Sequence, residues 1–315
     1  MQELFIEGNA LFGRFKETIL IEEFNYLESS LFYPDKSIYD KIAFYSVFGG
    51  SPFVNEMIDP SESLKDNIIN TFLKVGSGVY NYANNILFTD TANRLQAKRI
   101  VSALGNSKKR YSELESLLDI EKTGKINAAL KSLCELGVVG KIYPINKLDD
   151  SKKAYYEITD NALRFFHTYV NKSNSILTVL GAEAFYDEYV APSLQTFIDH
   201  QFENVVRTFF SLKVKKGLIK GISNIGTYYY DDSKTKTNGE FAVALKQSDG
   251  YAIYEVKYYK DVVKKETFAK ELEQISNIQE INVTNIGFVS VYGFEENDEK
   301  YDYVDGKSIY DETLL

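Results

Sequence analysis

The fold of the last third of the chain is decided by the stretch Asn238-Gly239-Glu240-Phe241-Ala242, the turn Ser248-Asp249-Gly250 and the run Tyr254-Glu255-Val256-Lys257. These residues predict two strands joined by a tight turn. Side chains two residues apart on a strand project from the same face, so we expect Glu255 and Lys257 side by side. There, a carboxylate can bind a divalent metal while an ammonium steadies an attacking water or the scissile phosphate. The alternative is an ordinary ion pair, because such pairs occur by chance in many strands.

The preceding strand decides whether a metal site is complete. Its alternation predicts that Glu240, Ala242 and Ala244 share one face and that the apolar residues between them share the other. Mg²⁺ prefers hard oxygen ligands from more than one element, so a second carboxylate is expected at the inner position. That position is Ala242, and Glu240 lies one strand repeat away, about 6–7 Å. With two histidines and one cysteine in the chain, a His/Cys zinc site is excluded, so carboxylates would hold any metal.

The surrounding residues predict an α/β core over residues 171–315. Helical stretches are expected from Glu183 onward, and one carries an apolar stripe of helical spacing formed by Phe202, Val205, Val206, Phe209 and Phe210. Three strands are expected next, at Ile225–Tyr230, Glu240–Leu245 and Tyr251–Tyr258. A charged helix over about 264–275 and a final strand at Asn285–Val291 should follow. This order is typical of an α/β domain rather than of a β-sandwich.

The middle of the chain, residues 91–170, predicts a winged helix-turn-helix. Helical periodicity covers Arg94–Leu104, Tyr111–Leu118 and about Thr123–Leu136, and two strands are expected at Val138–Ile145 and Ala154–Thr159. In a winged helix, the third helix enters the major groove of DNA. The third helix here has no arginine placed to recognise guanine, so any sequence preference should be weak or come from DNA shape.

Charge separates this middle segment from the rest of the chain. Residues 91–170 hold 14 basic and 9 acidic residues, whereas residues 1–90 hold 6 and 13, and residues 171–315 hold 16 and 23. A local basic patch is the footprint expected of phosphate contacts. The candidate DNA-binding residues are Lys108, Lys109, Arg110, Lys122, Lys125, Lys131, Lys152 and Lys153. The alternative is a winged helix that docks another protein, with its lysines merely solvated.

Residues 1–90 are expected to be mostly helical after one strand at Glu17–Glu22 and an aromatic turn at Phe24-Asn25-Tyr26. One helix should begin at an Asp35–Ser37 cap and end at Gly49-Gly50-Ser51-Pro52. A second helix should begin after Ser61 and Ser63.

Composition predicts a soluble, cytoplasmic protein. The 315 residues include 44% apolar residues, which is enough for several cores, and carry a net charge of −9. Every apolar run is broken before the roughly 18 residues of a bilayer helix, so no membrane partner is expected. The lone Cys134, between two leucines, is interpreted as a core residue rather than a nucleophile.

Several motifs, in this order, resemble a family of archaeal and bacterial P-loop ATPases. The C-terminal domain of that family, of DUF234 type, belongs to the PD-(D/E)XK, restriction-endonuclease-like nucleases. The motifs are Leu11-Phe12-Gly13-Arg14, Tyr45-Ser46-Val47-Phe48-Gly49-Gly50-Ser51-Pro52, the winged-helix segment, Phe202-Glu203, Gly226-Thr227-Tyr228-Tyr229-Tyr230-Asp231-Asp232, Thr237-Asn238-Gly239-Glu240-Phe241 and Tyr254-Glu255-Val256-Lys257.

The resemblance implies a catalytic set in one cleft, formed by Glu203, Ala242, Glu255, Lys257 and Gln274. Glu203 matches the helix carboxylate, and Gln274 falls where a polar helix residue often completes such sites. The implied cofactor is Mg²⁺ or Mn²⁺, with Glu255, Glu203 and Glu240 as candidate ligands. Ala242 stands where the family has a metal-binding Asp, so the chain is either a natural pseudo-nuclease or carries a deliberate change.

The second departure from the family is the absence of its ATPase core. No G-x-x-x-x-G-K-[ST] motif occurs, and Thr123-Gly124-Lys125 lacks the flanking residues, so we expect no nucleotide cofactor. Residues 1–90 are then interpreted as a helical remnant of the ATPase module, and the chain is expected to begin near the last strand of that module.

These observations predict a DNA-binding, metal-dependent nuclease-like protein that is impaired by Ala242, with endonuclease activity expected if Asp is restored there. The first alternative is a catalytically inactive DNA-binding or regulatory protein that works with a separate ATPase or as a homodimer. The second is a structural interaction module whose acidic outer segments keep it off DNA.

Overall fold

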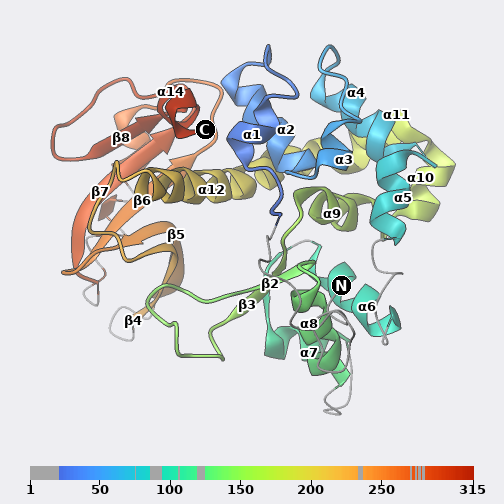
Figure 1. Cartoon of the computed structure of the whole chain (residues 1–315), viewed down its shortest axis with the longest axis horizontal. Coiled ribbons are helices and arrows are strands. Elements are labelled where there is room, and N and C mark those ends of the chain that lie inside the picture. The colour runs from blue at the N-terminus through green and yellow to red at the C-terminus, as the bar shows by residue number, and fades with distance from the viewer. Residues whose placement is uncertain are drawn as a thin grey trace, which may run out of the picture.

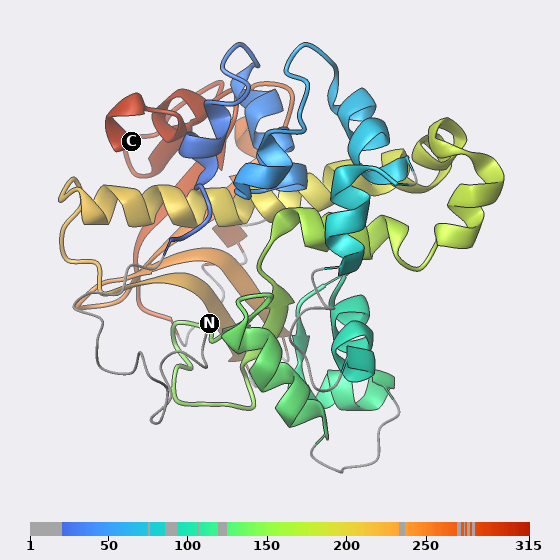
Figure 2. The ribbon, with the colours of Figure 1, turned by 45° about the vertical axis from the view of Figure 1, so that its right-hand side comes forward.

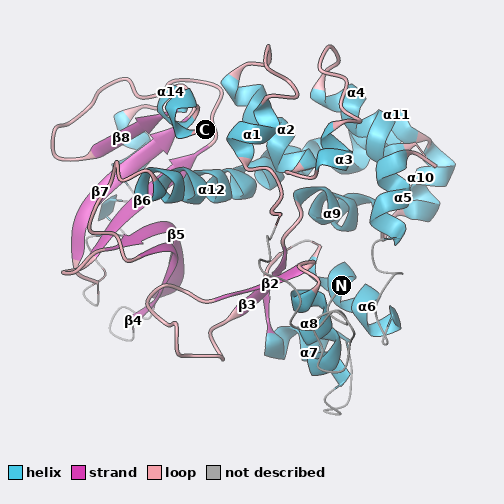
Figure 3. Ribbon diagram, in the orientation of Figure 1, coloured by secondary structure: helices cyan, strands magenta, loops and turns pink. Residues whose placement is uncertain are grey.

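The computed structural model describes residues 21–74, 76–85, 94–105, 107–118, 125–232, 237–269, 272–273, 275, 278 and 281–315. Within these ranges the protein is a mixed α and β structure with two sheets. The larger sheet lies at one side of the molecule and most helices lie at the other (Figure 3). The motif Leu11-Phe12-Gly13-Arg14 lies outside the described residues, as does almost all of the strand expected at Glu17–Glu22.

Short helices form the first third of the chain: α1 (Tyr26–Ser30), α2 (Ile38–Phe48), α3 (Pro52–Asn55), α4 (Leu64–Ile68), the π-helical turn η2 (Ile69–Leu73) and α5 (Gly78–Asn85). Both expected caps are confirmed, because the hydroxyls of Ser37 and Ser63 accept hydrogen bonds from backbone N–H groups at 3.1 Å. The aromatic turn is instead the start of α1. Asn25 and Glu28 form a capping box there, which pairs two backbone donors at the helix start.

The two glycines after α2 have different physical roles. Gly49 ends the helix with φ of 69°, a conformation that residues with a Cβ rarely adopt. Gly50 passes so close to the preceding segment that a Cβ would overlap the carbonyl of Phe24, and its own carbonyl accepts a hydrogen bond from the Phe24 N–H at 3.0 Å. The glycine pair therefore stops α2 and lets the chain before α1 pack beside it.

The middle segment folds into three helices and a small antiparallel sheet of order β1-β3-β2. Its elements are α6 (Arg94–Leu104), β1 (Lys109–Arg110), α7 (Tyr111–Leu118), α8 (Lys125–Glu135), β2 (Val139–Ile142) and β3 (Tyr155–Ile158). The predicted bounds of α6 and α7 are confirmed. β1 was not predicted, because two residues carry no periodicity. β2 ends earlier than expected because Ile145 leaves this sheet and donates its N–H to the carbonyl of Thr227 at 2.9 Å.

A series of helical elements follows the small sheet and ends with α12 (Ala191–Lys215), the longest helix among the described residues. The elements before α12 are α9 (Asn161–Phe165), the π-helical turn η4 (Phe166–Val170), α10 (Asn174–Leu180), α11 (Ala182–Phe185) and the π-helical turn η5 (Tyr186–Val190). α12 crosses the molecule from the larger sheet to α10 and α11 (Figures 1 and 2). The predicted stripe is confirmed as its inner face, since all five residues are at most 2% exposed.

The larger sheet has the order β4-β5-β6-β7-β8. Its strands are β4 (Asn224–Asp232), β5 (Thr237–Lys246), β6 (Tyr251–Lys257), β7 (Val283–Ser290) and β8 (Asp302–Asp305). β4, β5 and β6 are antiparallel neighbours, whereas β6, β7 and β8 are parallel. The prediction that β7 is the final strand was wrong. β8 has four residues and an acidic residue at each end, so it lacks the alternation that marks a strand.

Short helical elements complete the described C-terminal part, and residues 269, 272–273 and 275 are also helical. The helix expected at 264–275 begins as the 3-10 turn η6 (Lys265–Phe268), and α14 (Gly306–Ile309) and η7 (Glu312–Leu314) end the chain. None of the described helices combines the length and the apolar content needed to cross a membrane.

A β-bulge interrupts the alternation expected in β5. The register shifts by one residue between Gly226↔Ala244 and Tyr228↔Phe241. Consequently Val243 belongs to the core beneath α12, whereas Phe241 and Ala244 belong to the core on the other face of the sheet. The prediction that Ala244 shares a face with Glu240 was therefore wrong. An extra residue in a bulge turns the following side chains to the opposite face.

The largest hydrophobic cluster of the described residues contains side chains from all three parts of the chain, and two smaller clusters are separate from it. The largest cluster extends from Tyr26 to Leu314 and includes residues of α2, α6, α8, α12 and β6. Cys134 packs against this cluster in a partly buried position, and burial raises the pKa of its thiol. The interpretation of Cys134 as a packing residue agrees with this environment, because a raised pKa lowers the reactive thiolate fraction.

Candidate functional site

A cavity of about 410 Å³ lies where α12, β5 and the segment after α6 meet. α12 contributes Glu203 and Arg207, β5 contributes Glu240 and Ala242, and the residue before β1 contributes Lys108. Helical spacing explains the α12 pair, because residues four apart lie on one helix face. Two of the predicted site residues, Glu203 and Ala242, therefore share one cavity with the candidate ligand Glu240.

The carboxylates in this cavity already face cations of the protein itself. Lys108 Nζ lies 2.6 Å from Glu240 Oε1, and both side chains are about one-third exposed, at 31% and 35%. Burial raises the pKa of Glu203, the positive charges of Arg207, His200 and Lys108 oppose that rise, and the negative charge of Glu240 adds to it. Burial likewise lowers the pKa of the Arg207 guanidinium, and Glu203 opposes that change.

Ala242 lies at the bulge of β5, and its backbone carries the polar contacts. The Arg207 guanidinium donates to the Ala242 carbonyl and to the Asn204 side chain, and the Thr227 hydroxyl donates to the same carbonyl at 3.4 Å. Bulges often lie beside functional sites, where they redirect side chains. Here the bulge aims a methyl group into the cavity, and an arginine from α12 holds the bulge in place.

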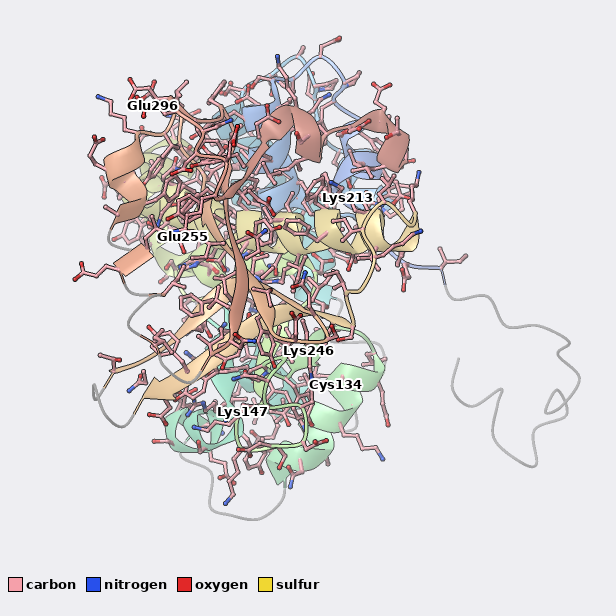
Figure 4. The ribbon with its side chains drawn as sticks, turned by 90° about the vertical axis from the view of Figure 1, so that its left-hand side faces the viewer. Cys134, Lys147, Lys213, Lys246, Glu255 and Glu296 are labelled. Atoms are coloured by element: carbon pink, nitrogen blue, oxygen red, sulfur yellow. The ribbon has the colours of Figure 1, made fainter. Side chains whose placement is uncertain are left out.

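The predicted pairing of Glu255 and Lys257 is confirmed, with Lys257 Nζ 2.7 Å from Glu255 Oε1. β5 and β6 are antiparallel, and Val243 is opposite Tyr254. Ala242 and Glu255, each next to a member of this pair, are therefore neighbours on the two strands. Neither Glu255 nor Lys257 is among the residues that line the cavity of Glu203. Figure 4 shows Glu255 at the height of α12, whereas Lys147, in the loop between β2 and β3, lies lower in the view.

Two charged residues of α12 were not predicted from the sequence: Asp199, one turn before Glu203, and Arg207, one turn after it. Burial raises the pKa of Asp199, and the positive charges of His200 and Lys257 oppose that rise. The charge of Lys257 thus acts on the pKa of Asp199, whereas it is not among the charges with the largest effect on the pKa of Glu203. The i−4 and i+4 spacing from Glu203 was the available signal for both residues.

The residues present do not fit a divalent metal. Among the described residues, no group of three or more His, Cys, Asp or Glu side chains is arranged to hold a metal ion. Glu240 is paired with Lys108, Glu255 is paired with Lys257, and Ala242 supplies no oxygen from its side chain. A site for Mg²⁺ needs several oxygen ligands in near-octahedral geometry, which these pairs do not offer. Gln274 lies outside the described residues.

The predicted DNA-binding residues divide into two groups. Lys108, Arg110 and Lys153 face the larger sheet: Lys108 pairs with Glu240, Arg110 lies 5.4 Å from the centroid of the Tyr229 ring, and Lys153 lies 4.5 Å from the same centroid. The others do not. Lys109 contacts Ser107 at 2.8 Å, Lys152 is exposed, and Lys131 is 79% exposed beside Glu135. Lys122 and the side chain of Lys125 lie outside what the structure describes.

The loop between β2 and β3 docks on the edge of the larger sheet. Ile145 binds the backbone of Thr227, and the Asn146 side chain both donates to the Tyr229 carbonyl at 2.7 Å and accepts from the Tyr229 N–H at 3.1 Å. The loop therefore makes contacts that a neighbouring strand would make. This contact fixes the middle segment against β4 and directs part of its positive charge inward.

Residues 166–272 match the DUF234 family, which is described as archaeal and bacterial proteins of unknown function. The match runs from η4 through α12 and the strands β4, β5 and β6, and covers less than half of the chain. No curated protein matches the chain significantly.

Among solved structures, the chain is similar to the crystal structure of protein VC1899 from Vibrio cholerae. The sequence identity is 12% and the TM-score is 0.29, over 80% of this chain and 55% of that chain. The chain thus spans about half the length of that protein. A similarity this low supports no statement about fold or activity.

Proposed function

We propose that this protein binds nucleic acid and does not cleave it. In this proposal, the middle segment is a winged helix and the C-terminal part is a restriction-endonuclease-like domain that has lost its catalytic function. The loss of catalysis is inferred from the pairing of Glu240 with Lys108 at 2.6 Å, in a cavity that Ala242 also lines. The family resemblance implies a metal-binding Asp at the position of Ala242. Each acidic side chain that could hold a metal there faces a cation of the protein.

The order of the elements supports the two domain assignments. Helix, strand, helix, helix and two strands in sequence, with the sheet order β1-β3-β2, is the arrangement expected of a winged helix. α12 followed by β4, β5, β6 and then the parallel strand β7 is the order that a restriction-endonuclease-like core requires. Fold alone does not assign an activity, so the proposal rests on the site rather than on this order.

Nucleic-acid binding is favoured by the charge of the middle segment. Its exposed cations include Lys131 on the proposed recognition helix α8 and Lys152 in the loop that docks on β4. Phosphate contacts from such residues would give binding of low sequence specificity that weakens as salt rises. A second candidate function, docking of a protein partner, is favoured by the engagement of Lys108, Arg110 and Lys153 with the larger sheet.

The test is a binding and cleavage assay on the same labelled DNA, with Mn²⁺ present and absent. We expect the native chain to bind with a steep salt dependence and to leave the DNA intact. Cleavage that needs Mn²⁺ and is abolished by Glu255→Gln would contradict the loss of catalysis. The Ala242→Asp variant, measured beside it by calorimetry with Mn²⁺, reports whether the missing carboxylate alone prevents metal binding. Absence of DNA binding at low salt would favour a protein partner instead.

A further inference from the structure

A second groove is lined by other residues than the cavity of Glu203 and has a different charge composition. The two are neighbours in the chain, since Ala103 and Lys109 line the groove whereas Leu104 and Lys108 line the cavity. The groove has a volume of about 580 Å³, and the cations lining it are Lys98, Arg99, Lys109 and Lys172. They come from α6, from β1 and from the segment after η4, so three separate parts of the chain converge on it. None of the described residues that line this groove is acidic, whereas the cavity of Glu203 contains nearly balanced charge.

The groove also offers neutral hydrogen-bonding groups beside its cations. Asn171 donates to the Ser102 hydroxyl at 3.2 Å, and both residues line the groove. The Arg99 guanidinium donates to the carbonyl of Leu118 at the end of α7, which holds that side chain at the groove wall. Serine, asparagine, arginine and lysine together are the side chains that contact phosphate and sugar in nucleic-acid complexes.

The groove does not belong to the proposed recognition helix. No residue of α8 lines it, and the helices that do, α6 and α7, lie together at the lower end of the molecule in Figures 1 and 2. A winged helix that used only α8 and its loop would leave this groove outside the interface. The groove residues were also not selected from the sequence, apart from Lys109, because they are scattered over more than seventy positions.

We propose that this groove binds the phosphate backbone of a nucleic acid, with Lys98, Arg99 and Lys172 as its main contacts. The inference rests on the proposed nucleic-acid-binding function and gives it a surface. A volume of this size exceeds one phosphate and accommodates a stretch of backbone. The converged cations would gather phosphates without reading bases, which agrees with the absence of a guanine-reading arginine on α8.

The experiment measures binding of a short fluorescein-labelled DNA duplex by anisotropy over a range of salt concentrations. The native chain is compared with three double variants. Lys98→Gln, Lys172→Gln changes the groove, Lys131→Gln, Lys152→Gln changes the proposed recognition helix and its loop, and Lys220→Gln, Lys307→Gln is the matched control outside both surfaces. Each pair removes two positive charges from exposed or partly exposed positions. Unchanged unfolding curves by circular dichroism show that each variant is folded.

We expect the groove variant to make the negative slope of log K against log salt shallower by about 1.8, which is two phosphate contacts at ~0.9 each, and the Lys220→Gln, Lys307→Gln control to leave the slope unchanged. A shallower slope only in the Lys131→Gln, Lys152→Gln variant would overturn the groove and keep the proposed function. No binding by the native chain would overturn both. Inorganic phosphate at matched ionic strength is the remaining arm. Displacement of the duplex by dilute phosphate would assign the groove to a free anion and overturn the backbone proposal.

Discussion

The ion pair between Lys108 and Glu240 gives the sharpest test of how the middle segment is attached to the larger sheet. The residues are 132 positions apart, and their charged atoms lie 2.6 Å from each other with each side chain about one-third exposed. Exposed pairs contribute about 0–1 kcal/mol. Breaking a fully buried pair by removing one partner costs about 3–5 kcal/mol. This pair lies between the two limits, so we expect a coupling free energy of about 1 kcal/mol.

The two single variants should differ because of Glu203. Lys108→Met leaves Glu240 and Glu203 as two carboxylates in one cavity, and the charge of Glu240 already raises the pKa of Glu203. Glu240→Gln leaves Lys108 with Glu203 still nearby. We therefore expect losses of unfolding free energy of about 2 kcal/mol for Lys108→Met, about 0.5 kcal/mol for Glu240→Gln and about 1.5 kcal/mol for the double variant.

Urea unfolding followed by circular dichroism measures all four proteins of this double-mutant cycle. A coupling of less than about 0.3 kcal/mol would refute the reasoning, because independent sites add within that margin. Equal losses for the two single variants would refute the role given to Glu203. Raising the salt concentration to about 1 M should weaken the coupling only in part, since partly buried pairs are screened less than exposed ones.

Three further predictions concern packing and pH. Gly50→Ala should destabilise the protein by more than about 1 kcal/mol in urea unfolding, because the added Cβ would overlap the Phe24 carbonyl. Phe202→Ala should cost about 3–5 kcal/mol, because its side chain is fully buried, whereas Leu218→Ala, 60% exposed, should change stability by less than about 0.5 kcal/mol. Burial and the charge of Lys172 lower the pKa of His167 to about 4, so the unfolded chain takes up a proton first as pH falls. Stability should then drop by about 3 kcal/mol between pH 6.5 and pH 4, and His167→Phe should remove that drop in unfolding curves measured across this range.

Local features of this protein were predictable from its sequence. The caps at Ser37 and Ser63 and the stop at Gly49 depend on residues within one helical turn. The pairing of Glu255 with Lys257 depends only on the fixed alternation of a strand. These interactions are settled by neighbours in the sequence, which a pattern can detect.

The features that were missed depend on distant partners. The bulge in β5 is defined by the pairing of β5 with β4. Arg207, one turn after Glu203 on α12, donates a hydrogen bond to the Ala242 carbonyl at this bulge. A charge count marked residues 91–170 as basic, yet it could not show that Lys108 faces Glu240 or that Lys153 faces Tyr229. The sequence therefore predicted which residue types form the candidate site. It did not predict the distant residues of the same chain that pair with them.

The docking of the β2–β3 loop on β4 has a consequence for solubility. β4 is an edge strand, and an open edge presents unpaired N–H and C=O groups that can recruit the same strand of another molecule. Ile145 and Asn146 bind the backbone of Thr227 and Tyr229 and so close part of that edge. The opposite edge, β8, is short and begins and ends with aspartate, which repels a second copy. The loop thus protects the sheet from edge-to-edge aggregation, and a variant with a shortened loop is expected to form β-rich aggregates at concentrations where the native chain stays dispersed.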